Sequence, residues 1–257
     1  MVTLSRPDSN APLARRLEAT ARPVLIHLPG SADTDSGVDA RIEISGSVLM
    51  TWAAKTAALC AAEDLDDGTR LRLDLPVHWM SLAVAFGAVC AGVEPTFPAE
   101  ADAADASRGD AAEDPAETTP GSAPDASVEV DAVVTQDAAA PLPPGALGLR
   151  LALPRDLSAV RAHPEEVSAA DVDMAEALLG EADRFADTPQ VPSAATVADP
   201  AAEAEDVLRL PGAVVLRHGP LQARHLAAAL QAWEDGRAVV VCAGDLAAGA
   251  REAGFSA

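Results

Sequence analysis

Residues 48–97 constrain the fold of this chain more than any other segment. An Ala-rich helical pattern over residues 48–59 is followed by a turn at Gly68, an alternating strand over 71–75, a second apolar helix over 78–92 and a strand over 93–97. This order of helix, strand, helix and strand is typical of one unit of a parallel α/β sheet.

Further strand and helix patterns surround this unit. We expect a single α/β domain over residues 1–257, with layered αβα architecture and a doubly wound, mostly parallel sheet. Residues 42–44 are expected to form a hairpin edge on the same body. The other expected strands cover residues 24–28, 41–44, 131–134, 149–153, 214–217 and 238–242, and a helix is expected over residues 221–233.

The charge balance excludes two classes of partner. The chain has 40 Asp and Glu against 18 Lys and Arg, a formal net charge of -22. Such a chain would repel phosphate backbones and anionic lipid headgroups, so we expect no nucleic-acid and no membrane partner. No window approaches the roughly 18 apolar residues of a membrane span, and the N-terminus lacks the apolar core of a secretory signal. The expected location is the cytoplasm.

Two segments interrupt the apolar periodicity. Residues 99–127 are rich in Asp, Glu, Ala and Pro and have a single basic residue, Arg108. A segment of this composition cannot bury enough apolar surface to offset its ordering entropy, so it is expected to be a disordered insertion. The alternative is an acidic segment that docks a basic partner. Residues 187–205 are rich in Ala and Pro and are expected to be a linker.

The order of these patterns is similar to that of a known superfamily. Residues 24–28, 48–59, 68–76, 78–92 and 131–136 resemble the N-terminal part of the acyl-adenylate-forming superfamily, the AMP-dependent synthetases and ligases. The pentapeptide Leu75-Pro76-Val77-His78-Trp79 is similar to a signature of a short, actinobacterial-type family of truncated ligase-like proteins. The resemblance implies the fold of the N-terminal subdomain of adenylate-forming enzymes.

The motifs that the same superfamily uses for chemistry are not found in this sequence. ATP needs backbone N–H groups and a cation around its triphosphate, yet residues 170–216 contain no Ser/Thr/Gly-rich loop with a lysine. The ribose-binding Asp motif and the C-terminal lid with its catalytic lysine are also not found. The only lysine, Lys55, is expected to be a surface charge on the first long helix. We therefore predict no catalytic residue, no cofactor and no metal site.

The best candidates for ligand contacts are His78 and Trp79. His78 follows a predicted strand and precedes a helix, and ligands of doubly wound sheets bind outside the carboxyl ends of the strands. The helix dipole would disfavour the imidazolium there, leaving a neutral ring. The alternative is a helix-capping histidine beside a packing tryptophan. Trp52 and Trp233 are expected to be core residues.

The other histidines and the cysteines indicate no site. His27, His163, His218 and His225 have no Cys, His or carboxylate at metal-ligand spacing. The three cysteines stand far apart in apolar surroundings, where a thiol serves as a small hydrophobic group. They are Cys60, Cys90 and Cys242.

Three functions are compatible with these observations. The favoured one is a non-catalytic remnant of the ligase domain that binds a small molecule, such as a carboxylic acid or a coenzyme A type ligand, or that regulates a partner. The second is an acid–CoA ligase-like enzyme half completed by a partner chain. The third is an acidic scaffold protein. We expect the chain not to be an enzyme by itself, because fold likeness does not confer activity.

Overall fold

The strands of this chain divide between two five-stranded sheets. The computed structural model describes residues 12–28, 41–98, 130–154, 167–199 and 201–256. Sheet A has the order β2 (Ile42–Ser45), β1 (Pro23–His27), β10 (Ala238–Cys242), β9 (Ala213–Arg217) and β8 (Val207–Arg209). Sheet B has the order β4 (Glu94–Thr96), β3 (Arg70–Asp74), β5 (Ala132–Thr135), β6 (Leu147–Arg150) and β7 (Val172–Asp173).

Most of the strand pairs are parallel, which confirms the predicted α/β class. Every pair in sheet B is parallel, as are the β1–β10 and β10–β9 pairs of sheet A. The edges of sheet A are antiparallel: β2 pairs with β1 as the predicted hairpin edge, and β8 pairs with β9. The division into two sheets was not predicted, because periodicity locates strands without telling which of them pair.

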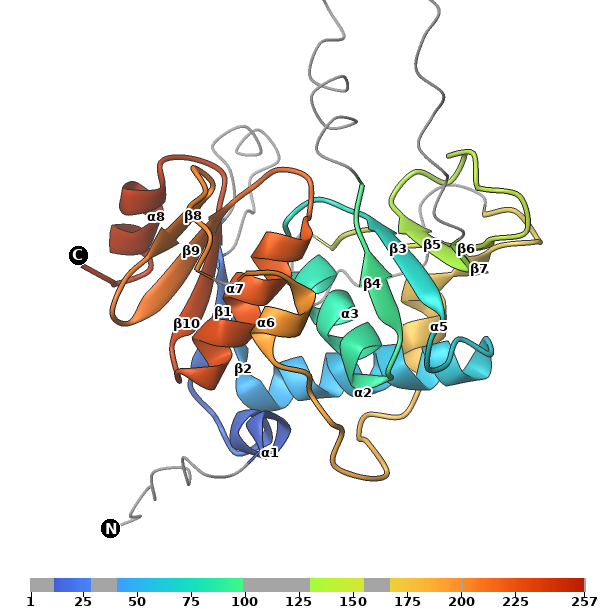
Figure 1. Cartoon of the computed structure of the whole chain (residues 1–257), viewed down its shortest axis with the longest axis horizontal. Helices are drawn as coiled ribbons and strands as arrows, with labels where there is room; N and C mark the ends of the chain where they lie inside the picture. The colour runs from blue at the N-terminus through green and yellow to red at the C-terminus, as the bar shows by residue number, and fades with distance from the viewer. Residues whose placement is uncertain (1–11, 29–40, 99–129, 155–166, 200, 257) are drawn as a thin grey trace, which may run out of the picture.

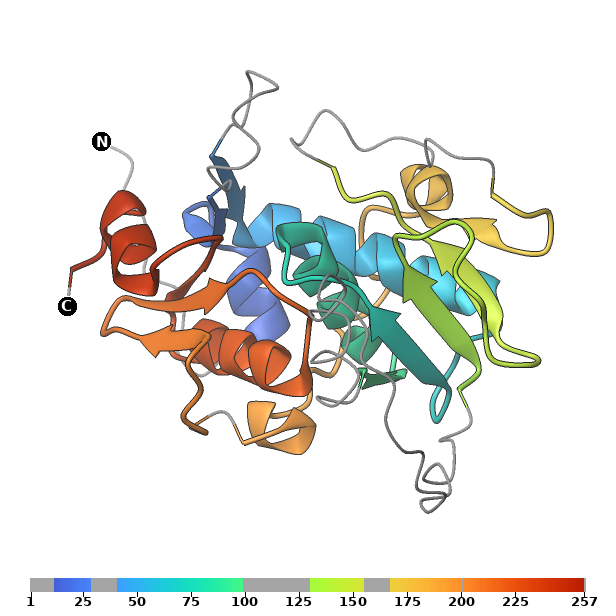
Figure 2. The same ribbon diagram turned by 90° about the horizontal axis from the view of Figure 1, so that it is seen from above.

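Helices fill the space between the two sheets (Figures 1 and 2). The long helix α2 (Gly46–Ala62) runs past both sheets, α3 (Trp79–Cys90) lies in the middle, and α7 (Ala223–Glu234) covers the inner face of sheet A. Helix α8 (Leu246–Glu252) covers the opposite face of sheet A with a small apolar core of its own. The described helices include none long and apolar enough to cross a membrane. Three further helices are α1 (Leu13–Glu18), α5 (Met174–Gly180) and α6 (Ala194–Val197).

Helix α3 is the centre of the main core. All its residues from Trp79 to Val89 are buried, because its sequence is apolar on every side. Gly87 allows α2 to approach closely: a Cβ at this position would lie 2.5 Å from Thr56 Cβ and 2.8 Å from the Ala53 carbonyl oxygen. The Phe86 ring packs edge-on against Trp233 of α7, with ring centroids 5.2 Å apart. Helix α3 thus joins elements of both sheets.

Lys55 is not the surface charge that the sequence predicts. Lys55 is only 8% exposed, and its Nζ donates a hydrogen bond to the Glu181 carbonyl oxygen at 2.7 Å. The same Nζ lies 2.7 Å from the carboxylate of Asp183. The prediction was wrong because the segment that follows α5 covers this face of α2, and a helical pattern does not show what packs on it.

Of the two segments that interrupt the apolar periodicity, the structure describes most of residues 187–205 but none of residues 99–127. The predicted acidic insertion at residues 99–127 lies outside the described residues. Residues 187–205 contain the short helix α6, which packs against α7, and Ala194 at its start is fully buried. Helices α1, α5 and α8 and strands β7 and β8 were not predicted, since each has eight residues or fewer and too few repeats of its period to stand out.

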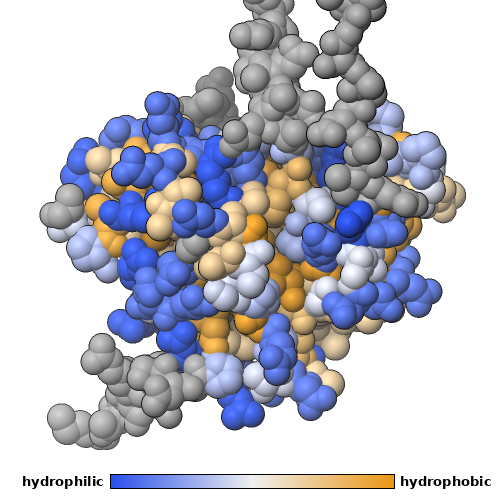
Figure 3. All heavy atoms as spheres, in the orientation of Figure 1, coloured by the Kyte–Doolittle hydropathy of each residue, from blue (hydrophilic) through white to orange (hydrophobic). Residues whose placement is uncertain are grey.

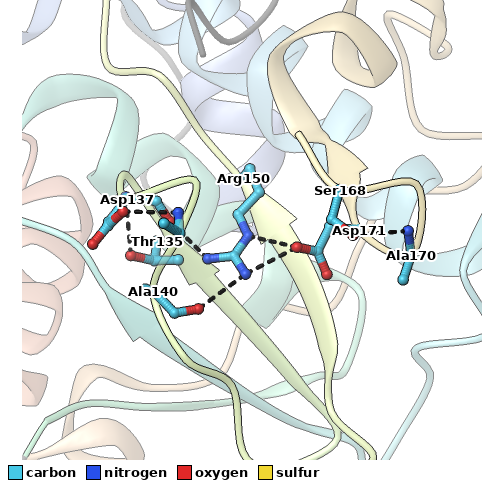
Figure 4. A network of polar contacts seen from close by, with 8 residues as sticks. Thr135, Asp137, Ala140, Arg150, Ser168, Ala170 and Asp171 are labelled. Atoms are coloured by element: carbon cyan, nitrogen blue, oxygen red, sulfur yellow. Dashed lines mark hydrogen bonds and ion pairs between the residues drawn. The ribbon is translucent and has the colours of Figure 1, made fainter. Parts of the chain in front are cut away.

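A buried arginine fixes the carboxyl end of β6 (Figure 4). The guanidinium of Arg150 is 4% exposed, and its Nε and Nη2 both lie 2.9 Å from Asp171 Oδ2. Nη1 donates to the carbonyl oxygen of Asp137 at 2.6 Å, and Nη2 donates to that of Ala140 at 3.1 Å. A buried charge is tolerated only when it is paired and hydrogen-bonded, and here both conditions hold.

We expect Arg150→Met to lower the free energy of unfolding by about 3–5 kcal/mol, because it leaves the buried carboxylate of Asp171 without its partner. Urea denaturation measures the change. Arg72→Met is the control: Arg72 lies on β3 of the same sheet and pairs with Asp74, but both side chains are well exposed. It should cost less than about 1 kcal/mol. Equal costs for the two variants would contradict the structural role of Arg150.

Candidate functional site

Strand ends from the two sheets meet at one place. The segment that follows β3 pairs with the segment that follows β9: Val77 N–H donates to the Gly219 carbonyl oxygen at 2.7 Å, and Leu221 N–H donates to that of Leu75 at 2.8 Å. Between these bonds, Pro76 and Pro220 form an antiparallel bridge. The carboxyl end of β3 in sheet B therefore lies beside that of β9 in sheet A.

Three histidines gather at this junction. His27 is the last residue of β1, His78 directly precedes α3, and His218 directly follows β9. The ring centroid of His27 lies 4.5 Å from that of His78 and 5.0 Å from that of His218. His27 is buried, whereas His78 and His218 are half-buried. We call these three residues the histidine cluster.

The ring of His78 caps α3. Its Nδ1 accepts a hydrogen bond from the Met80 N–H at 3.1 Å, and the carbonyl oxygen of Pro154 is a further hydrogen-bond partner of the ring. Accepting through Nδ1 assigns the proton to Nε2. Burial, together with the neighbouring His27 and His218, lowers the pKa of His78 to about 2. The ring is therefore neutral, as predicted, but burial rather than the helix dipole is the main cause.

His27 forms the floor of the cluster. Burial, followed by the neighbouring His218, lowers its pKa to about 3. Its Nδ1 is buried and has no hydrogen-bond partner in the described part of the chain. The floor of the junction is therefore an uncharged imidazole ring, and its Nδ1 makes no hydrogen bond with the described chain.

Trp79 lies behind the cluster, in the core. The residue is fully buried, and its ring packs edge-on against Trp52 with centroids 6.0 Å apart. Its centroid is 5.8 Å from that of His78. Trp79 and Trp233 are core residues, and Trp52 is partly buried against the same core. Trp79 is therefore placed to support the ring of His78 from within.

The histidine cluster does not form a metal centre in this conformation. Within the described ranges, no group of three or more His, Cys, Asp or Glu side chains is arranged to hold a metal ion. A ligating imidazole must present a free nitrogen to the metal, but Nδ1 of His78 accepts the Met80 N–H. The described cysteines are unpaired, and burial raises the pKa of Cys60 and Cys90 to about 12.

A pocket of about 890 Å³ adjoins the junction. Arg217, which precedes His218, and Gln222, the first residue after Leu221, contribute to its wall. Glu203 and Glu205 lie on the opposite chain segment, ahead of β8, and Phe97 follows β4. We call this space the β9 pocket. Sequence analysis did not single out Arg217, although its place at the end of a predicted strand is a usable signal.

The carboxylate of Asp206, in the wall of the β9 pocket, is bonded to two neighbouring side chains. Asp206 accepts hydrogen bonds from Arg224 Nε at 3.2 Å and Nη2 at 2.8 Å, and its Oδ2 lies 2.9 Å from His225 Nε2. Burial alone would raise the pKa of Asp206, but the contacts with Arg224 and His225 outweigh it and lower the pKa to about 2. Nδ1 of His225 in turn accepts the N–H of Gln222. This network holds the start of α7 in place.

A second groove is mostly apolar. It has a volume of about 440 Å³ and lies between the end of α3 and residues 190–197, with Val89, Val93, Pro95 and Val191 in its wall. Figure 3 shows hydrophobic residues gathered on this face over the region of α3, α6 and β4. The groove carries no titratable group except Glu94. It therefore has little capacity to orient a polar ligand.

The fold of this chain is similar to that of solved structures, although its sequence matches no known family. No protein-family model matches the sequence, and no curated protein matches it. Solved structures do match. The N-terminal domain of FACL13 from Mycobacterium tuberculosis superimposes with a TM-score of 0.54 at 14% identity, over 95% of this chain and 60% of that one. An acyl-CoA synthetase from Brucella canis gives a TM-score of 0.55 at 14% identity, over 91% of this chain and 44% of that one.

The chain has the fold of the N-terminal part of adenylate-forming enzymes. An inhibitor-bound structure of the same FACL13 domain matches equally, with a TM-score of 0.53 at 14% identity, over 95% of this chain and 60% of that one. The chain thus spans less than two thirds of the length of these proteins. The resemblance is confirmed for the fold, whereas the short actinobacterial-type family stays a prediction.

The resemblance implies a phosphate loop within residues 170–216. Residues 170–216 form β7, α5, α6, β8 and most of β9. The connection from β8 to β9 is a tight turn at Pro211 and Gly212, in which Leu210 N–H donates to the Ala213 carbonyl oxygen at 2.8 Å. Two residues cannot wrap a triphosphate, and the sequence of this region has no lysine.

We expect the free energy of unfolding to fall as the pH is lowered from about 6.5 to about 5. The pKa values of His27 and His78 lie near 3 and near 2 in the folded chain, so in this range the unfolded chain binds more protons than the folded one. Each ring contributes a loss of up to about 1.4 kcal/mol per pH unit. Urea denaturation at a series of pH values measures the slope.

The variant His27→Gln tests the origin of this slope. Removing one of the rings whose pKa the fold lowers should make the slope smaller by up to about 1.4 kcal/mol per pH unit. Asp206, whose low pKa affects stability only at more acidic pH, is unchanged in the variant. An unchanged slope would mean that His27 is not held neutral by the fold.

Proposed function

We propose that this chain is a non-catalytic, small-molecule-binding module that uses the crevice at the carboxyl ends of its parallel strands. The observation that carries the proposal is the junction of β1, β3 and β9, where the histidine cluster adjoins the β9 pocket. Ligands of parallel α/β sheets bind outside the carboxyl ends of the strands, where the connections leave room and helix N-termini converge.

The non-catalytic part of the proposal is supported by the state of the lysine, histidine and cysteine side chains and by the backbone of residues 170–216. Acyl-adenylate formation needs a cradle for the triphosphate, and residues 170–216 hold a tight hairpin instead. The one lysine is held by Glu181 and Asp183. His27 and His78 have pKa values too far below neutral for general acid–base work. The raised pKa values of the cysteine thiols disfavour the nucleophilic thiolate.

The geometry indicates how a ligand would be held. His78 and His218 are half-buried and flank the buried ring of His27, so a flat or narrow ligand group could lie against the imidazole rings. Trp79 would act indirectly, by supporting His78 from the core. The ligand classes that this proposal favours are a small carboxylic acid and a coenzyme A type molecule, and binding would in turn regulate a protein partner.

A thermal-shift screen with ATP and magnesium, AMP, coenzyme A and a panel of carboxylic acids tests this function. A ligand that binds only the folded chain stabilises it by about 2.7 kcal/mol at a concentration of 100 times its Kd. We expect a dose-dependent rise in Tm with an acid or with coenzyme A. A flat response across the panel would contradict the binding function, and release of pyrophosphate from ATP would contradict the non-catalytic one.

His78→Asn is the matched variant for this screen. Asparagine is a good N-cap residue, so the start of α3 keeps its acceptor and the change in stability should stay within about 1 kcal/mol. The imidazole is lost, so a ligand held at the cluster should lose most of its Tm shift. An undiminished shift would place the ligand elsewhere.

A further inference from the structure

The segment that leaves α5 toward α6 is held to the described fold by side chains alone. Residues 181–189, which we call the strap, lie across α1 and α2 (Figure 1). They form no helix or strand, and most of them are exposed. Among the described residues, 182–192 take part in no backbone–backbone hydrogen bond. A segment without such bonds belongs to the parts of a fold that open at the lowest free energy.

Lys55 of α2 is the strongest contact of the strap. Its ammonium group bonds the Glu181 carbonyl oxygen and the Asp183 carboxylate, and Phe185 is half-buried against the main core. The side chain of Lys55 is 11% exposed, whereas that of Asp183 is 70% exposed. Because the strap itself covers the ammonium group, opening the strap brings Lys55 into water and leaves no buried charge without a partner. The contact can therefore break while the rest of the fold stays intact.

The end of the strap separates two cavities. One, of about 300 Å³, lies between the strap, α1 and α2, with Met50 in its wall. The other, of about 550 Å³, lies between α1, the end of α7 and the residues up to Val191. Arg15, Thr188 and Pro189 belong to the walls of both. Arg15 Nε donates a hydrogen bond to Thr188 Oγ1 at 3.1 Å, so this exposed bond is part of the partition between the cavities.

We propose that the strap is a gate that opens as a unit while the two sheets stay folded, with Lys55 as its latch. Release of the strap removes the shared wall at Thr188 and joins the two cavities into one groove along α1. The state of one ion pair thus sets the size of the groove. This device goes beyond the proposed function, since the contacts that hold the strap do not involve the histidine cluster.

Limited proteolysis of the whole chain with trypsin tests whether the strap opens by itself. Arg184 is exposed and is the only Lys or Arg in residues 162–208. A protease must extend several residues around the cleaved bond, so cleavage after Arg184 reports opening of the strap. Arg150 is buried, and cleavage after it reports unfolding of the whole fold. Mass spectrometry should show cleavage after Arg184 at least tenfold faster, and equal rates would overturn the proposal.

Two variants test the latch. Lys55→Met keeps a long apolar side chain but loses the charged contacts, so cleavage after Arg184 should become roughly tenfold faster or more. Val215→Ala is the control, because this fully buried residue lies in the small core beside α8 and its loss of volume weakens the fold as a whole. It should leave cleavage after Arg184 unchanged. An unchanged rate in Lys55→Met, or an equal rise in both variants, would overturn the role of Lys55.

The partition between the cavities has its own test. Thr188→Val removes only the exposed hydrogen bond to Arg15, so cleavage after Arg184 should rise by less than about threefold. A rise as large as that of Lys55→Met would place the latch at Thr188. Nile red, a neutral apolar dye, measures the groove: its fluorescence should be higher with Lys55→Met than with the natural chain or with Val215→Ala. Equal fluorescence with all three would overturn the joining of the cavities.

Discussion

Burial of α3 between the two sheets is the constraint on which the rest of the structure depends. A helix that is apolar on every side must be covered on every side, and one sheet can cover only part of it. Sheet A with α7, sheet B and the long helix α2 together complete the cover. The close approach at Gly87 and the contact between Phe86 and Trp233 fix where α3 lies. Its N-terminus, and with it His78, is consequently fixed at the line where the sheets meet.

This arrangement explains the unusual electrostatics of the junction. The same burial that packs α3 removes water from the rings at its N-terminus, so His27 and His78 stay uncharged over the whole neutral range. Rings that stay uncharged at neutral pH are suited to recognition rather than to proton transfer.

The sequence predicted the positions of most long helices and strands, but it did not predict which strands pair with one another. Strands β1, β3, β9 and β10 and helices α2, α3 and α7 were predicted close to their observed bounds, because each is an apolar or alternating run of typical length that is bounded by polar or turn residues. The two sheets were missed, since pairing is a long-range property. The candidate site shows the same division: His78 was singled out from its place after a strand, whereas its neighbours His27 and His218 are far away in the sequence. Each of them ends or follows a parallel strand, and that shared position is the signal that joins them.

Lys55 has a consequence for any chemistry directed at amines. It is the only lysine of the chain, and its ammonium group is enclosed between α2 and the segment that follows α5. Reagents and enzymes that modify the lysine side chain would therefore find it only when that segment moves away from α2. The extent of labelling at Lys55 thus reports how often this contact opens. A chain in which the contact is intact would react very little with such reagents.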